Sequence, residues 1–403
     1  MAEKAAEGIF LEIKENMSGY SKDCWPTTEQ SLLLRAALLK GPAAIDAWEQ
    51  WAELVDFDDI DYGSQRLLPL LYRNLVDHSI QSPLMARYKG FYRRFWMSNQ
   101  VLFDRTKSVL STLHDAGIEA LLLKGAALVI NEKLSYGLRP MDDIDFLVRE
   151  DVAQEAYTII LELGWQPKLQ PLRDFDPLDH AAPFDDGKGH SIDLHWRSLA
   201  HDLNGSLGMG YWERSSEAEF GGIPIRVMGA TDQLIHTCVH GIHWNPVPPI
   251  RWIADATMIL RNPESQIRWD HLIMHSKTLR VSLQMFQGLR YLETELGVPI
   301  PDYVLESLET IPVSRAENFH HGLSVRKPLP VVGVFTLKLT RYWAYYRKQH
   351  RFPGFLRYLQ NQWNVRHLWQ VPFEGVLRMW RMIRIDLFQQ SPGSVSLPSK
   401  FQK

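Results

Sequence analysis

The sequence predicts an α+β protein in which a strand-containing core lies between two helical regions. Three observations indicate this. Apolar residues recur at helical spacing over residues 29–113, they alternate with a period of two at 141–148 and 191–196, and helical spacing returns after Gly229. The 403 residues are therefore expected to form an N-terminal helical segment (1–113), a core (114–230), a C-terminal helical domain (231–390) and a flexible tail (391–403).

The N-terminal region is predicted to be helical throughout. Leu32, Leu33, Ala36 and Leu39 follow the spacing of one helix face. Farther on, a proline precedes the stretch 84–113 and Gly117 follows it, which is the usual punctuation of a helix. We expect that helix to make about eight turns.

The core alternates strands and helices. The apolar run 118–123 predicts a buried strand, which ends at Lys124-Gly125, and a helix is expected at 126–132. A second strand at 141–148 precedes a helix at 151–163, with Asp151 as its cap and Gly164 at its end. A Gly-containing loop at 185–189 predicts a hairpin of strands 180–184 and 190–196.

The C-terminal region returns to helix. Thr231 or Asp232 is the expected cap of a helix with apolar residues at 234, 235, 238 and 239, and helices follow at 251–260, 269–279 and 281–296.

Basic and aromatic residues are interleaved between positions 326 and 384. Three interpretations stay open for this basic C-terminal stretch: it binds RNA through phosphate charge and base stacking, it lies on an anionic membrane as an amphipathic helix, or its arginine stems cover a helical core. Its basic residues are Arg341, Arg347, Lys348, Arg351, Arg357, Arg366, Arg378, Arg381 and Arg384.

Composition excludes several classes of protein. A net charge of −3 argues against a dedicated nucleic-acid binder, and two cysteines are too few for a disulfide framework. The first residues include acids without a long apolar run, so no secretory signal is expected. No stretch approaches the roughly 18 apolar residues of a membrane span. We therefore expect a cytoplasmic protein without a transmembrane segment.

The chemistry is expected at Asp143 and Asp145, which share one face of the strand at 141–148. Two carboxylates about 4 Å apart repel by roughly 4 kcal/mol at an effective dielectric near 20, unless a cation lies between them. A divalent metal such as Mg²⁺ suits these oxygen ligands and serves phosphoryl and nucleotidyl transfer. Asp-x-Asp alone is nevertheless a weak signal.

Two further features make the pattern more specific. Asp193 and His195 share one face of the second hairpin strand, where Asp193 would supply a third carboxylate. Lys124-Gly125 lies where a strand gives way to a helix. A Gly there lets backbone N–H groups approach a phosphate at the helix N-terminus.

Other polar residues carry two interpretations each. Arg139 either clamps a phosphate or forms a salt bridge, and Asp142 is expected to be solvated or capping. His180 either enters a substrate pocket or is structural, and hydrogen bonding within the sheet is the expected role of His195. For the helix histidines the expected role is packing or pocket lining rather than metal binding; these are His236, His240 and His243.

The sequence at these positions resembles the uncharacterised nucleotidyltransferase family, a bacterial branch of the DNA polymerase β-like nucleotidyltransferase superfamily. The resemblance covers about residues 29–260. It is carried by Leu-Leu-Leu-Lys-Gly-Ala-Ala-Leu at 121–128, Arg-Pro-Met-Asp-Asp-Ile-Asp-Phe-Leu-Val at 139–148 and Ile-Asp-Leu-His-Trp at 192–196, with supporting matches at 68–72, Arg251-Trp252 and Asp255.

The resemblance implies a mixed sheet flanked by helices, a nucleoside triphosphate (NTP) donor, and Mg²⁺, or alternatively Mn²⁺, held by Asp143 and Asp145. Asp193 corresponds to the third carboxylate, which orients the metal or accepts the acceptor's proton. Gly125 matches the glycine of the phosphate-contacting turn. Many superfamily members have Ser where Ala126 stands, so Lys124 is expected to contact the phosphate as a point charge.

The predicted reaction is Mg²⁺-dependent transfer of a nucleoside monophosphate to an acceptor hydroxyl, with release of pyrophosphate. The favoured acceptor is a small molecule, a natural product or a sugar, which would fit a pocket between core and helices. A tRNA end or a protein side chain would make better use of the basic C-terminal stretch. The alternative is a non-catalytic nucleotide-binding or RNA-binding protein that retains the fold.

Overall fold

The computed structural model describes residues 24–168, 180–198, 206–245, 247, 249–326, 339, 342, 352–363 and 365–389. Contacts divide the chain into two units, Met1–Leu169 with His180–Lys327 and Gln170–Asp179 with Pro328–Lys403. The predictions for the first residues, for the tail 391–403 and for the basic residues 341, 347, 348 and 351 lie outside the described residues.

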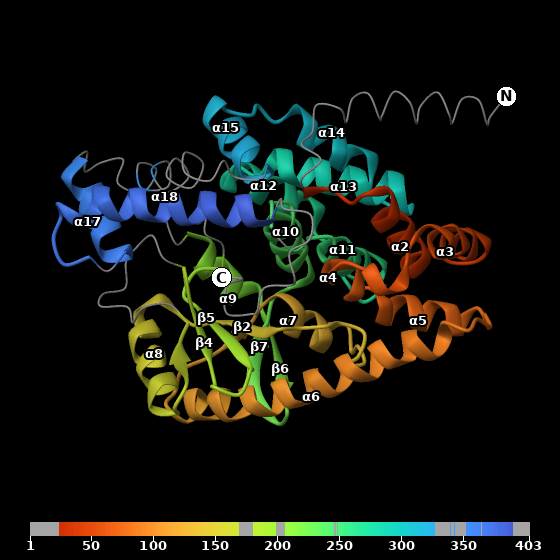
Figure 1. The fold of residues 1–403 in the computed structure, drawn as a ribbon, viewed down its shortest axis with the longest axis horizontal. Coiled ribbons are helices and arrows are strands. Elements are labelled where there is room, and N and C mark those ends of the chain that lie inside the picture. The colour runs from red at the N-terminus through yellow and green to blue at the C-terminus, as the bar shows by residue number, and fades with distance from the viewer. Residues whose placement is uncertain are drawn as a thin grey trace. The chain divides into compact units, whose positions relative to one another are not determined.

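A seven-stranded sheet forms the centre of the first unit (Figure 1). Its strands are β1 (Leu121–Leu122), β2 (Asp143–Leu147), β3 (Gln166–Pro167), β4 (Ala181–Asp185), β5 (Ser191–His195), β6 (Ser216–Phe220) and β7 (Ile223–Val227). They lie in the order β3-β4-β5-β2-β1-β7-β6. The β1–β7 and β2–β5 pairs are parallel and the others antiparallel, so the implied mixed sheet and the predicted β4–β5 hairpin are confirmed.

The apolar alternation seen in the sequence sets the register of β2 against β5. Ile144 pairs with Ile192 and Phe146 with Leu194, and all four side chains are fully buried. A shift by one residue would turn these side chains to the opposite face, so burial of this row specifies the pairing. The intervening acids therefore project together from the other face.

Helices surround the sheet, and α6 runs along it for most of its width (Figure 1). Those before the sheet are α2 (Thr28–Leu38), α3 (Pro42–Leu54), α4 (Tyr62–Gln65), α5 (Leu68–Asp77) and α6 (Met85–Asp115), with a 3₁₀ turn at Phe57–Asp59. Those between strands are α7 (Lys124–Asn131), α8 (Ala153–Glu162) and α9 (Ser206–Arg214), with a 3₁₀ turn at Glu150–Val152. Those that follow are α10 (Ala230–Gly241), α11 (Arg251–Arg261), α12 (Trp269–Leu279), α13 (Ser282–Leu296), α14 (Asp302–Thr310) and α15 (Arg315–Ser324).

Two predicted helix caps are wrong. Gly229 is the N-cap of α10, so Thr231 and Asp232 lie inside its first turn, where Asp232 is ion-paired with Arg214. Helix α8 begins at Ala153 after the 3₁₀ turn, so Asp151 does not cap it. In contrast, the predicted long helix is confirmed as the 31-residue α6.

The β6–β7 hairpin and α9 were not predicted. Gly221 and Gly222 connect the two strands with φ of 59° and 86°. Positive φ at both central residues is what a two-residue type I′ turn requires. The Gly-Gly pair between two short alternating segments is therefore the sequence feature that could have predicted this hairpin.

The second unit contains α17 (Phe352–Gln362) and α18 (Gln370–Gln389), which pack around Phe355, Leu359 and Val371. Among the helices that the structure describes, none is long and apolar enough to cross a bilayer.

The crossing of α10 and α11 gives the first prediction. A Cβ at Gly241 would overlap the Cβ and ring of Trp252, and a side chain's Cβ cannot swing away. We expect Gly241→Ala to lower the free energy of unfolding by about 3 kcal/mol, measured in urea. Gly90→Ala is the matched control, because a Cβ there, inside α6, meets nothing within 4 Å. It should stabilise the protein by up to about 1 kcal/mol, and equal effects of the two changes would refute the close packing at Gly241.

Candidate active site

The parallel pairing of β2 with β5 brings acids from two strands together. Asp145 lies directly opposite Asp193, and Asp143 lies opposite Ser191. Neighbouring strands are about 4.8 Å apart, and paired residues project to the same face. One ligand atom each of Asp145, Asp193 and His195 accordingly lies within 4.8 Å of the others. The structure thus gathers the predicted carboxylates and His195 at one place, the carboxylate cluster.

Lys124 supplies a cation inside this cluster. Its Nζ lies 2.5 Å from Oδ1 of Asp145, and Nε2 of His195 lies 3.0 Å from the same oxygen. A cation of the chain itself therefore lies beside Asp145, in the place where the sequence predicted that a positive charge is needed. Lys124 reaches this position with a backbone φ of 47° at the first residue of α7, a conformation that side-chain-bearing residues rarely adopt. Strain of this kind is common at functional sites.

The electrostatic surroundings shift the pKa values of the three acids in different directions. Burial opposes ionisation of Asp145, but the Lys124 ammonium and His195 outweigh it and hold the pKa of Asp145 well below its usual value. At Asp143, burial and repulsion by Asp145 and Asp193 raise the pKa to about 7. Burial, followed by Asp145, also raises the pKa of Asp193. Asp145 is thus ionised at neutral pH, while Asp143 is partly protonated there.

These donors fit a divalent metal. Carboxylate oxygens are the ligands that Mg²⁺ and Mn²⁺ prefer, and Asp143 and Asp193 are partly exposed, so a cation can reach them. The raised pKa values show two carboxyl groups whose charges lack full compensation from Lys124 alone. In addition, Nδ1 of His195 is buried and has no hydrogen-bond partner among the residues that the structure describes, which marks this part of the site as incompletely satisfied.

The start of α7 is suited to an anion. Its N-cap, Leu123, makes no side-chain hydrogen bond to the helix, so the N–H groups of the first turn have no side-chain cap. Such groups and the helix dipole favour phosphate. Gly125 has a further, steric role: a Cβ there would lie 2.9 Å from Sδ of Met141 and 3.1 Å from Cζ of Arg139. The glycine therefore allows the segment that leads into β2 to approach α7.

Arg139 lies in a buried ion-paired group. Its Nε and Nη2 lie 2.9 and 2.8 Å from Oδ2 of Asp255, and its Nη1 donates to the carbonyl of Pro140. Arg251 binds the other oxygen of Asp255 at 3.1 Å and donates to the carbonyls of Arg66 and Leu138. The structure thus shows the salt bridge foreseen as one interpretation of Arg139. A phosphate contact stays a prediction, and it would require Arg139 to leave Asp255.

Asp142 points away from the cluster. It is exposed, accepts a hydrogen bond of 2.6 Å from the Tyr62 hydroxyl and lies 3.5 Å from Arg66.

Two groups of histidines lie in this part of the fold. The ring of His180 lies 5.8 Å from that of His195. On α10, the His236 and His240 rings stack at 5.7 Å, and His243 follows at 5.4 Å from His240. Burial and the Lys124 ammonium lower the pKa of His236 to about 4, so its imidazole is uncharged at neutral pH. The wide spacing of the α10 rings supports packing or pocket lining rather than shared metal binding.

A second group of ligating side chains, Asp232, His271 and His275, lies apart from the cluster. Arg214 binds both oxygens of Asp232, at 2.8 and 3.1 Å. The carboxylate is thus already neutralised by a guanidinium, and this group is best explained as an ion pair that joins α9 to α10.

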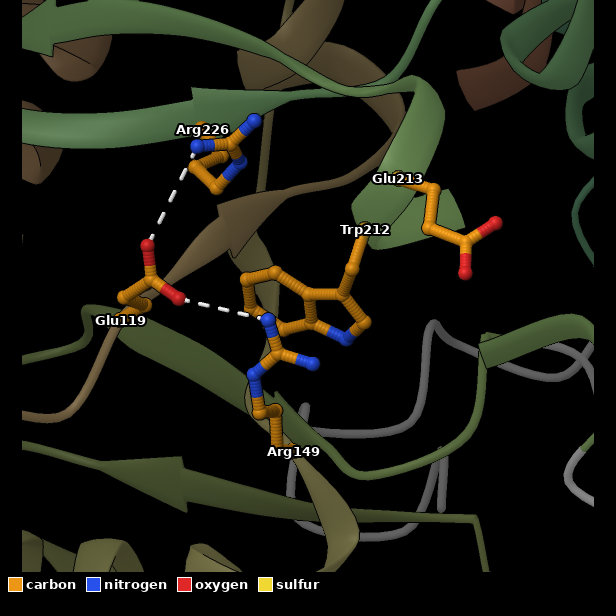
Figure 2. A pocket seen from close by; sticks show the side chains of 5 residues that line it. All are labelled: Glu119, Arg149, Trp212, Glu213 and Arg226. Carbon is orange, nitrogen blue, oxygen red and sulfur yellow. Dashed lines mark hydrogen bonds and ion pairs between the residues drawn. The ribbon is translucent and has the colours of Figure 1, made fainter. Parts of the chain in front are cut away.

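A cavity of about 390 Å³ lies at the other end of β2, lined by Glu119, Arg149, Trp212, Glu213 and Arg226 (Figure 2). Figure 2 shows Glu119 between the two arginines, 3.5 Å from Arg149 and 4.0 Å from Arg226. Arg149 also covers the Trp212 ring at 4.6 Å. Glu119 is paired with both arginines, and Arg149 lies two residues after the end of β2, whereas Asp143 is its first residue. This cavity is therefore separate from the carboxylate cluster.

The sequence matches one known protein family. This family, described as uncharacterised nucleotidyltransferase, matches residues 62–297, more than half of the chain. No curated protein matches the sequence.

Two solved structures are similar over part of the chain. One is the lincosamide antibiotic adenylyltransferase LnuA with lincomycin bound, at 11% identity and a TM-score of 0.30, covering 39% of this chain and 96% of that one. The other is the antibiotic-resistance factor ANT(2'')-Ia, at 14% identity and a TM-score of 0.32, covering 48% and 97%. At TM-scores this low they say nothing about the substrate of this chain.

The raised pKa of Asp143 predicts how metal binding depends on pH. A metal needs the ionised carboxylate, so the affinity for Mn²⁺ should rise by up to about tenfold per pH unit between pH 5.5 and 7 and level off above about pH 7. Calorimetry across this range measures it. Asp143→Asn should bind Mn²⁺ more weakly and with a flatter profile. An affinity for the wild type that does not change over this range would contradict the assignment.

The buried arginine pair predicts a large effect at Asp255. Asp255→Asn removes the only charge that the described contacts place between Arg139 and Arg251, and we expect it to cost about 3–5 kcal/mol in urea unfolding. Glu264→Gln is the control, because its pair with Lys133 is solvent-exposed and should leave the midpoint unchanged. Similar effects of both changes would show that the Asp255 group does not stabilise the fold.

Proposed function

This chain belongs to the uncharacterised nucleotidyltransferase family, and we propose that it transfers a nucleoside monophosphate from an NTP to the hydroxyl of a small acceptor, with Mg²⁺ or Mn²⁺ as cofactor. The observation that carries the proposal is the register of β2 and β5, which sets Asp145 opposite Asp193 beside Asp143 and Lys124. An ordinary sheet has no need of three acids on one face.

In this proposal Asp143, Asp145 and Asp193 hold the metal. The bound cation supplies charge neutralisation for the triphosphate and for the pyrophosphate that leaves. Asp145 is ionised at any physiological pH, so one ligand is always ready, whereas Asp143 becomes available near neutrality.

Lys124 and the first turn of α7 would hold the phosphates. The Lys124 ammonium is the charged donor at this helix N-terminus, and its contact with Asp145 fixes its position before substrate arrives. Ala126 offers no hydroxyl, so the phosphate contacts fall to Lys124 and to backbone N–H groups from Gly125 onward.

Asp193 would accept the proton of the acceptor hydroxyl. Burial and the neighbouring Asp145 raise its pKa, which makes it a better base than an exposed aspartate. The new bond joins the acceptor oxygen to the α-phosphorus, and the bond to the bridging oxygen of pyrophosphate breaks.

The acceptor would lie beside the histidines of the site. The His180 ring lies 5.8 Å from that of His195, and imidazole nitrogens exchange hydrogen bonds with hydroxyl groups. This supports a hydroxyl-bearing small molecule, a sugar or a natural product. Because NTPs are the donors, we place the protein in the cytoplasm.

The test is transfer of label from α-³²P-labelled NTPs into an extract of small metabolites, with Mg²⁺ present. Asp143→Asn and Asp145→Asn should each lower the rate by about a thousandfold, as expected from losing several kcal/mol of charge stabilisation. Asp142→Asn is the matched control, since this neighbouring acid binds Tyr62 outside the cluster and its loss should leave the rate unchanged.

NTP binding without label transfer to any acceptor would favour the alternative, a nucleotide-binding protein that retains the fold. Equal rates for the wild type and Asp145→Asn would overturn the assignment of the site.

A further inference from the structure

Helix α18 exposes large apolar side chains along one face. The exposed fractions are 65% for Trp369, which immediately precedes the helix, 66% for Phe373, 57% for Val376 and 46% for Leu377. At 100° per residue these four positions fall within an arc of about 100°. We call this the α18 apolar face.

The opposite face of α18 already has its packing partners. Val371 is buried, and a Cβ at Gly375 would lie 3.4 Å from the Trp363 ring. Arg378 lies over the same ring at 5.6 Å and donates to Glu374 at 2.8 Å. Among the side chains that the structure describes in this unit, those packed against α18 therefore lie on the face opposite the apolar one, and burying the apolar side chains elsewhere would be favourable.

The segment that carries this face has an excess of positive charge. Between residues 352 and 389 the chain has five arginines and two acids, although its net charge overall is −3. The described side chains of Arg357 and Arg366 are exposed. An amphipathic helix with aromatic and aliphatic residues on one face and arginines beside them is typical of a segment that lies in the interface of an anionic bilayer.

We propose that the α18 apolar face binds an anionic lipid surface, with the helix parallel to the membrane plane. Trp369, Phe373, Val376 and Leu377 would insert at the boundary between headgroups and acyl chains, where aromatic rings are favoured. The arginines would contact lipid phosphates. This property is separate from the proposed nucleotidyl transfer.

Other occupants fit less well. RNA binding by base stacking uses aromatic rings on a polar, basic surface, but here the rings share their arc with Val376 and Leu377, which offer neither charge nor hydrogen bonds to a nucleic acid. Pairing with a second copy of this face would bring two sets of arginines together, which like-charge repulsion opposes.

Co-sedimentation of the full chain with vesicles tests the proposal. We expect binding to vesicles of phosphatidylcholine with one-quarter phosphatidylglycerol, at least tenfold weaker binding to phosphatidylcholine alone, and weakening by salt. Trp369→Ser combined with Phe373→Ser should reduce binding at least tenfold. The control is Met97→Ser on α6, which removes a side chain of similar exposure (64%) elsewhere and should leave binding unchanged.

Circular dichroism and label transfer show whether the double variant still folds, since both changed residues are exposed and the catalytic cluster is untouched. Absence of vesicle binding by the wild type would overturn the proposal, as would equal loss in Met97→Ser. Two other results would also overturn it, each in a protein that does not bind vesicles. RNA binding on filters that the double variant loses would assign the face to RNA. Concentration-dependent dimerisation in the ultracentrifuge that the double variant loses would assign it to a second copy of the chain.

Discussion

The contact between the Lys124 ammonium and Asp145 is the interaction on which the site depends. Asp145 is almost completely buried, at 4% exposure, and burial alone would keep it protonated. Lys124 reverses this and keeps Asp145 charged inside the cluster. In turn, Asp145 and Asp143 keep the pKa of partly buried Lys124 raised against the desolvation that would lower it. Each charge therefore stabilises the other, and in the proposed function Asp143 and Asp193 are the acids that respond to metal, substrate and pH.

Two apparently unrelated features hold this contact in place. The apolar row of Ile144 and Phe146 against β5 sets the strand register, so the acids cannot move to the other face. The Asp255 group then anchors the segment that enters β2, since Arg139 and Arg251 bind its two oxygens while donating to carbonyls around that segment. A buried ion pair costs desolvation, which such complete hydrogen bonding offsets. Here the Asp255 group fixes the position of the first residue of β2.

Much of this could be predicted from the sequence, because local patterns encode it. Alternation predicted β2 and β5, and it predicted that Asp143 and Asp145 share a face of one strand and that Asp193 lies on a face of another; the pairing of the two strands brings these faces together. What failed depended on distant partners. The sequence near Asp232 resembles a helix cap, yet the Asp232 carboxylate forms an ion pair with Arg214 from another helix. Arg139 has no local signal that separates a phosphate ligand from a partner of Asp255, which lies 116 residues away. The inward position of Lys124 was equally hidden, since a positive φ at a lysine is set by the packing around it.

The most direct test of the account is the anomalous signal of Mn²⁺ in crystals grown with the metal and a non-hydrolysable NTP analogue. The account predicts a peak about 2.2 Å from carboxylate oxygens of Asp143 and Asp145, with phosphate oxygens against the first turn of α7. A metal bound only elsewhere, for example at Asp232 and His271, with the carboxylate cluster bare beside a bound nucleotide, would contradict it.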